Sequence, residues 1–227
     1  MPRTARASVA DVCYHVINRG NGQRSVFHAD ADYAAFLKLL AEAKEHIPMR
    51  LLAYCLMPNH IHLVVRPVGD GDLGRWMQWL LTSHVRRYHR HYQTSGHVWQ
   101  GRFKAFPVQE DDHLLTVIRY VERNPVRAAG LDVSMAEYWP WSSAGRPPGW
   151  VTRPTIDPWP VARASDWLDW VNRPLTTSEE QAIRQSVKRS CPFGQALWRE
   201  ETAARLGLEA TLRPRGRPRK NQPAPKK

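Results

Sequence analysis

Four short segments rich in β-forming residues and three longer segments with apolar residues at helical spacing make up the first half of the chain. The β-rich segments are 12–18, 50–57, 60–66 and 102–109, and the helical ones are 30–46, 71–92 and a third that starts at 110–112. Pro58 and Asn59 form a turn between the second and third strands, which predicts an antiparallel hairpin. Pro107 has no N–H group to donate, so the fourth strand is expected at a sheet edge. This order predicts an α+β fold of the ferredoxin-like, split βαβ type, with an antiparallel sheet and helices mainly on one face.

The pattern changes in the second half of the chain, after about residue 131. Three regions are expected there: a Pro- and Trp-rich linker over 146–175, a helical accessory region over 176–208, and a basic, AT-hook-like disordered tail over 209–227. Thr176 and Glu179 have the spacing of a capping box, which predicts a helix through about residue 189. A second helix is expected over 195–206. The C-terminal extension is therefore expected to be mostly helical.

The charge of the chain indicates a polyanionic partner. Its 227 residues include 33 Lys and Arg against 21 Asp and Glu, a formal net charge of +12. Seven of the basic residues lie in the last 17 positions, which contain no acid. Nucleic acid is the commonest soluble polyanion, so a nucleic-acid partner is favoured. The alternative is a charge that serves solubility or non-specific adhesion.

The composition also limits the compartment. Hydrophobic residues make up 42% of the chain and charged residues 24%, which excludes wholesale disorder. There is no run of about 18 apolar residues and no apolar segment of a secretory signal near the N-terminus, so no membrane association is expected. The three cysteines lack metal-type spacing and fit a reducing environment. We therefore expect a cytoplasmic protein.

His60 and His62 are the first candidates for chemistry. Alternate residues of a strand share a face about 7 Å apart, so the two imidazoles should point the same way and Ile61 the other way. Two neutral imidazoles side by side can bind a divalent metal. The alternative is a pair of ordinary polar residues on the solvent face of the sheet.

Tyr120 and Asn124 lie one turn apart on the helix that follows the fourth strand. A tyrosine hydroxyl is a poor nucleophile unless a cation or base assists it, and Tyr120 alone also fits a core residue with a solvated hydroxyl. Asn124 precedes Pro125, which is equally the pattern of an N-cap followed by proline at the first helical position.

Two basic segments are candidates for DNA contacts. In the tail, extended arginines between Gly and Pro suit the minor groove of A·T-rich duplex, or bind any phosphate; they are Arg213, Arg215, Arg217 and Arg219. In the segment 99–104, aromatic and cationic residues interleave, which suits stacking and phosphate contacts along a single strand.

Together these motifs resemble the HUH single-tyrosine transposases of small insertion sequences, and among them the REP-associated tyrosine transposases, found in bacterial chromosomes beside repetitive extragenic palindromes. His60-Ile61-His62 after Met57-Pro58-Asn59 resembles the HUH motif, and residues 120–128 resemble the nucleophile helix. Tyr14-His15-Val16 with Asn18-Arg19-Gly20, and Trp99 to Phe103, are similar to other family segments. The resemblance covers residues 9–145, which we take as the transposase domain.

The resemblance implies a metal-dependent endonuclease and strand transferase of the bacterial nucleoid. Tyr120 would be the nucleophile and would form a 5′-phosphotyrosine link. Mg²⁺ or Mn²⁺ would be held by His60, His62 and, by motif position, Asn124. Imidazoles are softer ligands than Mg²⁺ prefers, which favours Mn²⁺ in vitro. The implied substrate is single-stranded, hairpin-forming DNA of palindromic repeats, contacted by Arg19, Trp99, Gln100 and Arg102, by a monomer or a dimer.

One other class of function fits the same features. A non-catalytic DNA-binding protein on the same fold would use the basic tail and the segment 99–104, but it would need neither the two histidines nor Tyr120. An RNA-binding module is less consistent, because no strand carries the aromatic motif of the usual RNA-recognition sheet.

Overall fold

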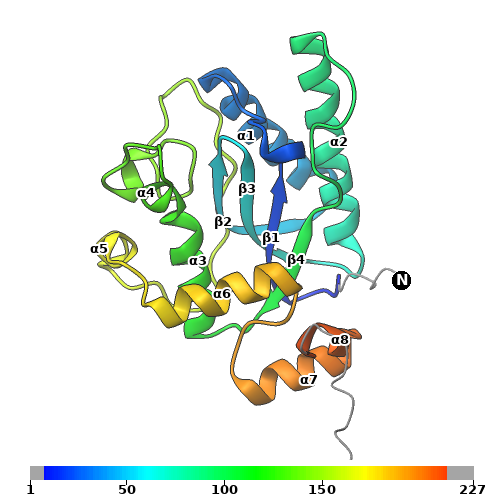
Figure 1. The fold of residues 1–227 in the computed structure, drawn as a ribbon, viewed down its shortest axis with the longest axis vertical. Coiled ribbons are helices and arrows are strands. Elements are labelled where there is room, and N and C mark those ends of the chain that lie inside the picture. Colours follow the sequence, from blue (N-terminus) through cyan, green and yellow to red (C-terminus); the bar gives the residue numbers. More distant parts are fainter. Residues whose placement is uncertain (1–7, 214–227) are drawn as a thin grey trace, which may run out of the picture.

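A four-stranded antiparallel sheet forms the centre of the protein, of which the computed structural model describes residues 8–213 (Figure 1). The strands are β1 (Cys13–Arg19), β2 (Met49–Met57), β3 (His60–Pro67) and β4 (Lys104–Val108), in the order β2-β3-β1-β4. β2 and β3 form the expected hairpin, with Met57 opposite His60. β4, which contains Pro107, lies at the edge as predicted.

Helices cover both faces of the sheet. α1 (Asp30–His46) and α2 (Asp72–Tyr92) pack on one face, against Val16 and Leu63, as the split βαβ arrangement predicts. α3 (Asp112–Glu122) packs on the opposite face, against Val64 and Phe106. The α+β, ferredoxin-like prediction is confirmed; the helices after β4 add a second layer to its one-sided arrangement.

The remaining elements are short or belong to the C-terminal half. They are η1 (Asn21–Gln23), α4 (Asn124–Arg127), η2 (Ala136–Tyr138), α5 (Trp167–Asn172), α6 (Thr177–Arg189), α7 (Ala196–Leu206) and α8 (Glu209–Leu212). α6 and α7 match the two predicted helices of the accessory region, and the capping box is formed: Thr176 Oγ1 accepts from Glu179 N, and Glu179 Oε2 accepts from Thr176 N. Phe193, between α6 and α7, exchanges backbone hydrogen bonds with Pro107 and Gln109 and so covers the open edge of β4.

The expected linker over 146–175 is packed structure. It contains α5, and two of its side chains bond the backbone of β2: Trp159 Nε1 donates to Leu52 O at 2.8 Å, and Asp157 Oδ2 accepts from Leu51 N at 2.7 Å. The tryptophans of this segment do not follow a helical period, so the sequence does not predict α5. Their large apolar area is nevertheless buried against the sheet. The segment therefore belongs to the core that supports α3.

Trp167 holds this segment in place, and its removal should destabilise the protein. The ring is 2% exposed, and Nε1 donates to Glu122 Oε2 at 2.7 Å. Trp167→Ala would leave a cavity and remove a hydrogen bond from a buried carboxylate, so we expect a loss of about 3–5 kcal/mol in the free energy of unfolding. Trp150, which is 64% exposed, is the matched control, and Trp150→Ala should change that free energy by no more than about 0.5 kcal/mol. Urea unfolding of both variants measures the difference, and equal effects would show that α5 packs loosely.

The start of the predicted tail is the short helix α8, after which Arg213 is exposed. Arg215, Arg217 and Arg219 lie outside the described residues, so the minor-groove role of the tail stays a prediction. In the described part of the chain, every helix is too short or too polar to cross a membrane.

Candidate active site

Two histidine side chains share one face of β3, as the sequence predicts. The ring centroids of His60 and His62 are 4.9 Å apart, while Ile61 between them packs in the core on the α1–α2 side. His62 is 2% exposed and His60 is half-buried. A ligand would therefore approach the two imidazoles from the side of His60, the more exposed of the two.

A third histidine, His15 of β1, joins the pair. Its Nε2 lies 2.8 Å from Nδ1 of His62, and the two rings stack with centroids 5.0 Å apart. Sequence reasoning noted His15 only as part of a family segment. The signal that could have found it is its position in β1, because odd-numbered residues there face the same side as the even-numbered residues of β3.

Hydrogen bonds at Nδ1 orient both β3 imidazoles. His60 Nδ1 donates to Asn59 Oδ1 at 2.6 Å, so Nε2 of His60 carries a free lone pair. When His62 Nδ1 donates to His15, the Nε2 of His62 is free in the same way. An outer partner at one ring nitrogen is the usual arrangement of metal-binding histidines.

The surroundings keep these imidazoles neutral. Burial, together with the charge of Arg19, lowers the pKa of His60 to about 4. Burial lowers the pKa of His62 well below its ordinary value, and the neighbouring His60 and His15 lower it further. Neutral imidazole is the form that binds a metal ion.

Tyr120 approaches the histidines from α3. Its ring centroid lies 5.9 Å from that of His62 and 6.2 Å from that of His15. α3 is held there because Leu114, Val117 and Val121 bury its apolar stripe against the sheet. Tyr120 is 7% exposed, so it is a largely buried residue whose ring also faces the histidine cluster.

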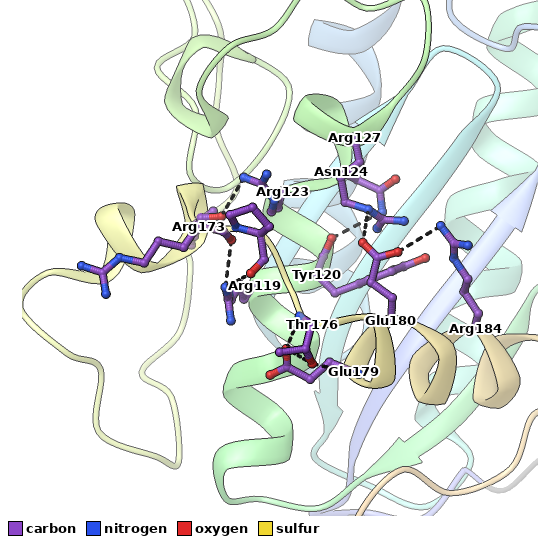
Figure 2. A network of polar contacts seen from close by, with 12 residues as sticks. Arg119, Tyr120, Arg123, Asn124, Arg127, Arg173, Thr176, Glu179, Glu180 and Arg184 are labelled. Carbon is purple, nitrogen blue, oxygen red and sulfur yellow. Dashed lines mark hydrogen bonds and ion pairs between the residues drawn. The ribbon is translucent and has the colours of Figure 1, made fainter.

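Asn124 begins the short helix α4, one turn after Tyr120 (Figure 2). The N-cap of α4 is Arg123, without a side-chain cap, so the alternative reading of Asn124 as an N-cap is wrong. Asn124 Nδ2 lies 3.5 Å from Tyr120 O, a long contact at the limit of a hydrogen bond. The carboxamide therefore lies at the C-terminal end of α3, against the main chain of Tyr120.

The side chains of His60, His62 and Asn124 fit a divalent metal held by two neutral imidazoles and one amide oxygen. Among residues 8–213, no group of three His, Cys, Asp or Glu side chains is placed to hold a metal ion. Asn124 carries an amide oxygen, a ligand type that divalent metals such as Mg²⁺ and Mn²⁺ accept. That assignment of Asn124 stays a prediction.

A basic cavity of about 350 Å³ lies beside the histidines. It is lined by three of the residues predicted to contact DNA, Arg19, Gln100 and Arg102, together with Lys104 and with Val187 of α6. Arg19 is paired with His60 across the β1–β3 ladder, so the cavity adjoins the pair of imidazoles. The cationic residues can hold the phosphates of a strand next to the histidines.

The fourth predicted contact in this region, Trp99, is not at the surface. Its side chain is 6% exposed and packs in the core on the α1–α2 side, with its ring 5.2 Å from His84 and 6.4 Å from Phe36. The expectation that Trp99 offers a stacking face to a base is therefore wrong. The burial of its large apolar ring outweighs any surface role.

Buried histidines should make the protein unfold in mild acid. Burial lowers the pKa values of His15 and His84 to about 3, whereas an unfolded histidine titrates near 6.5. The unfolded chain therefore binds more protons below pH 6.5, and stability falls as pH falls towards the folded pKa values, by about 1.4 kcal/mol per pH unit for each such group. Burial raises the pKa of Glu122, which acts in the opposite direction, but it is one group against several.

Urea unfolding in EDTA at several values between pH 7 and pH 4.5 measures the slope of the free energy of unfolding against pH. His84 lies among aromatic rings, and its Nδ1 has no hydrogen-bond partner in the described part of the chain. His84→Phe should therefore reduce the slope by about 1.4 kcal/mol per pH unit. If the free energy of unfolding of the unmodified protein does not change with pH, the histidines are not buried in their neutral form. The same holds for His84 if His84→Phe leaves the slope unchanged.

Comparison with known proteins adds to this geometry. The family described as "Transposase IS200 like" matches residues 8–124. A Haemophilus influenzae protein that bears the name REP-associated tyrosine transposase is 30% identical over 113 residues, which are 45% of this chain and 62% of that protein. The chain thus spans less than two thirds of that relative. A solved structure of a REP-associated tyrosine transposase bound to a REP hairpin superposes with a TM-score of 0.53 at 19% identity, over 63% of this chain and 82% of the other, and shares its fold.

Proposed function

The chain belongs to the family of IS200-like transposases, and from that premise we propose that it cleaves and rejoins single-stranded DNA through Tyr120. The observation that carries the proposal is the approach of the Tyr120 ring to 5.9 Å from the His62 ring, on the face that also presents His60. A binding protein needs neither the nucleophile nor neutral imidazoles beside it.

The reaction is an in-line displacement at phosphorus. The Tyr120 oxygen forms a bond to the scissile phosphorus and the bond to the 3′ oxygen breaks, which leaves a 5′-phosphotyrosine link and a 3′ hydroxyl. The proton that the tyrosine loses is balanced by the one that the leaving 3′ oxygen gains. Another 3′ hydroxyl then attacks the link and restores the tyrosine, so no high-energy cofactor is consumed.

His60 and His62 orient this chemistry, with Asn124 as the proposed third ligand. Mg²⁺ or Mn²⁺ bound there would polarise the scissile phosphate and offset the charge that develops on it. The contribution of the chain is to hold two neutral imidazoles beside the tyrosine. Nε2 of His60 is free, and Nε2 of His62 is free when its Nδ1 donates to His15. His15 fixes the ring of His62 and acts as a positioning residue.

The substrate we propose is single-stranded DNA next to a hairpin of a palindromic repeat, in line with the hairpin bound by the solved relative. The cavity lined by Arg19, Arg102 and Lys104 would hold the strand beside the scissile phosphate. Arg213 and the arginines that follow it would add contacts to A·T-rich duplex.

The test is to incubate the pure protein with oligonucleotides from palindromic repeats flanking its own gene, in Mn²⁺ or in EDTA. The proposal predicts a slower protein band on a denaturing gel in Mn²⁺ alone. Tight binding without that band would favour the second candidate, a non-catalytic DNA-binding protein on the same fold. Neither binding nor band would reject the substrate class.

A further inference from the structure

One guanidinium lies directly over the nucleophile candidate. Arg127, the last residue of α4, places its Cζ 4.6 Å from the centroid of the Tyr120 ring (Figure 2). Its side chain is 17% exposed, and its Nη1 is buried without a hydrogen-bond partner among the described residues. A buried, unpaired N–H of a charged group is unfavourable by about 1–3 kcal/mol or more, which indicates a site made for an anion.

Arg127 differs from the two other arginines on the same stretch of chain. Arg119 and Arg123 donate to backbone carbonyls at the end of α5 and just beyond it, so their charge is committed to holding α5 (Figure 2). Among the described residues, Arg127 makes one side-chain ion pair, from Nε to Glu180 Oε1 at 2.9 Å. Its Nη1 is left without a partner there, in a guanidinium that lies over the Tyr120 ring.

Among the described residues, two side chains contact the Arg127 guanidinium: the ring of Tyr120 on α3 and the carboxylate of Glu180 on α6. The Glu180 carboxylate pairs with Nε, and no described acidic side chain bonds Nη1. An anion that approaches Tyr120 would therefore find an unpaired N–H group of Arg127 beside the ring.

Glu180 fixes the direction of the guanidinium from the accessory region. Its Oε1 accepts from Arg127, and its Oε2 lies 3.1 Å from Nη2 of Arg184, which is one turn further along α6. The capping box of Thr176 and Glu179 sets the first turn of α6, in which Glu180 lies. The accessory region therefore contributes a side chain that orients a cation at the nucleophile.

We propose that Arg127 binds a non-bridging oxygen of the scissile phosphate and that Glu180 of α6 positions Arg127 for it. The inference rests on the proposed function, because it takes Tyr120 as the attacking group. Arg127 stays protonated throughout and supplies charge to the phosphate as negative charge develops on its oxygens. The C-terminal helices then complete the active site instead of serving only as an appendage.

A charge-neutralised substrate tests this assignment. In the Tyr120→Phe background, which cannot cleave, the dissociation constant is measured for an oligonucleotide with a natural scissile phosphate and for one with a neutral methylphosphonate at that position. With Arg127 present, neutralising the phosphate should weaken binding about tenfold. With Arg127→Gln added, the two oligonucleotides should bind equally, and Arg127→Lys should restore part of the difference.

Arg184→Gln is the matched control, because Arg184 also pairs with Glu180 but is 62% exposed and has no contact with Tyr120. It should leave the tenfold difference unchanged, whereas Glu180→Gln should reduce it. If neutralising the phosphate weakens binding equally with Arg127 and with Arg127→Gln, the proposal is overturned and Arg127 serves only to hold α6. The same conclusion follows if Arg127→Gln lowers the thermal stability but keeps the tenfold difference in binding.

The same set of measurements separates this inference from the proposed function. A protein that forms the covalent adduct but shows no coupling between Arg127 and the phosphate refutes the inference alone. Coupling without any adduct in the unmodified protein refutes strand transfer and leaves Arg127 as a phosphate-binding residue. Failure of the Tyr120→Phe protein to bind the oligonucleotide rejects both.

Discussion

Tyr120→Phe should abolish cleavage of single-stranded repeat DNA while leaving the fold and DNA binding intact. The variant loses the oxygen that bonds to phosphorus, and no other group can replace a removed nucleophile, so we expect a rate at least ~10³-fold lower. The ring of Tyr120 stays, and with it the packing against His62 and the contact with Arg127. The rate of adduct formation on a denaturing gel, with the dissociation constant measured beside it, separates chemistry from binding.

Tyr138→Phe is the control, because Tyr138 is 65% exposed and lies outside the site. It should cleave at the unmodified rate. Residual adduct in Tyr120→Phe at more than about a hundredth of the unmodified rate would mean that another residue is the nucleophile.

His60→Ala should remove the metal dependence of cleavage. The change deletes one of the two imidazoles on β3, and His60 is the more exposed of the pair, so the fold should tolerate it. Loss of metal-assisted charge stabilisation, worth several kcal/mol, corresponds to a cleavage rate about 10²–10³-fold lower. The same variant should bind Mn²⁺ at least about tenfold more weakly in a titration that follows free Mn²⁺ by electron paramagnetic resonance.

His91→Ala provides the comparison, because His91 is an exposed histidine at the end of α2. Its Mn²⁺ affinity and its cleavage rate should match those of the unmodified protein. Unchanged Mn²⁺ affinity in His60→Ala would show that the imidazole pair is not the metal site, whatever happens to the rate.

The features that depend on local pattern could be predicted from the sequence. The alternation of His60, Ile61 and His62 follows from the two-residue period of a strand, and the hairpin follows from Pro58 and Asn59. Arg19, Gln100 and Arg102 were expected to contact DNA, and the structure brings them to one cavity beside the histidines.

Contacts between distant segments could not be predicted in this way. The approach of Tyr120 to His62 depends on how α3 packs across the sheet, and the pairing of His15 with His62 depends on the register of two strands 47 residues apart. The same limit explains Trp99, whose sequence neighbours suggest a surface loop although its ring is covered by α1 and α2.

The C-terminal half shows the limit most clearly. Residues 146–175 have no periodicity, and only the folded chain reveals that Trp159 and Trp167 pack on the sheet side that carries α3. Glu180 and Arg127 lie 53 residues apart in sequence, so their ion pair has no local signature. From the sequence alone, a charged residue such as Glu180 on a helix of the accessory region is expected to be exposed to solvent.

Mass spectrometry of the covalent adduct shows whether Tyr120 is the residue that bonds to DNA. The protein is incubated with a hairpin-bearing single-stranded oligonucleotide in Mn²⁺, digested with trypsin and nuclease, and analysed for the peptide over residues 120–123, which trypsin releases between Arg119 and Arg123. We expect this peptide to carry a nucleotide through a phosphodiester bond at Tyr120. A nucleotide on any other residue, or none at all while DNA is cleaved, would contradict this expectation.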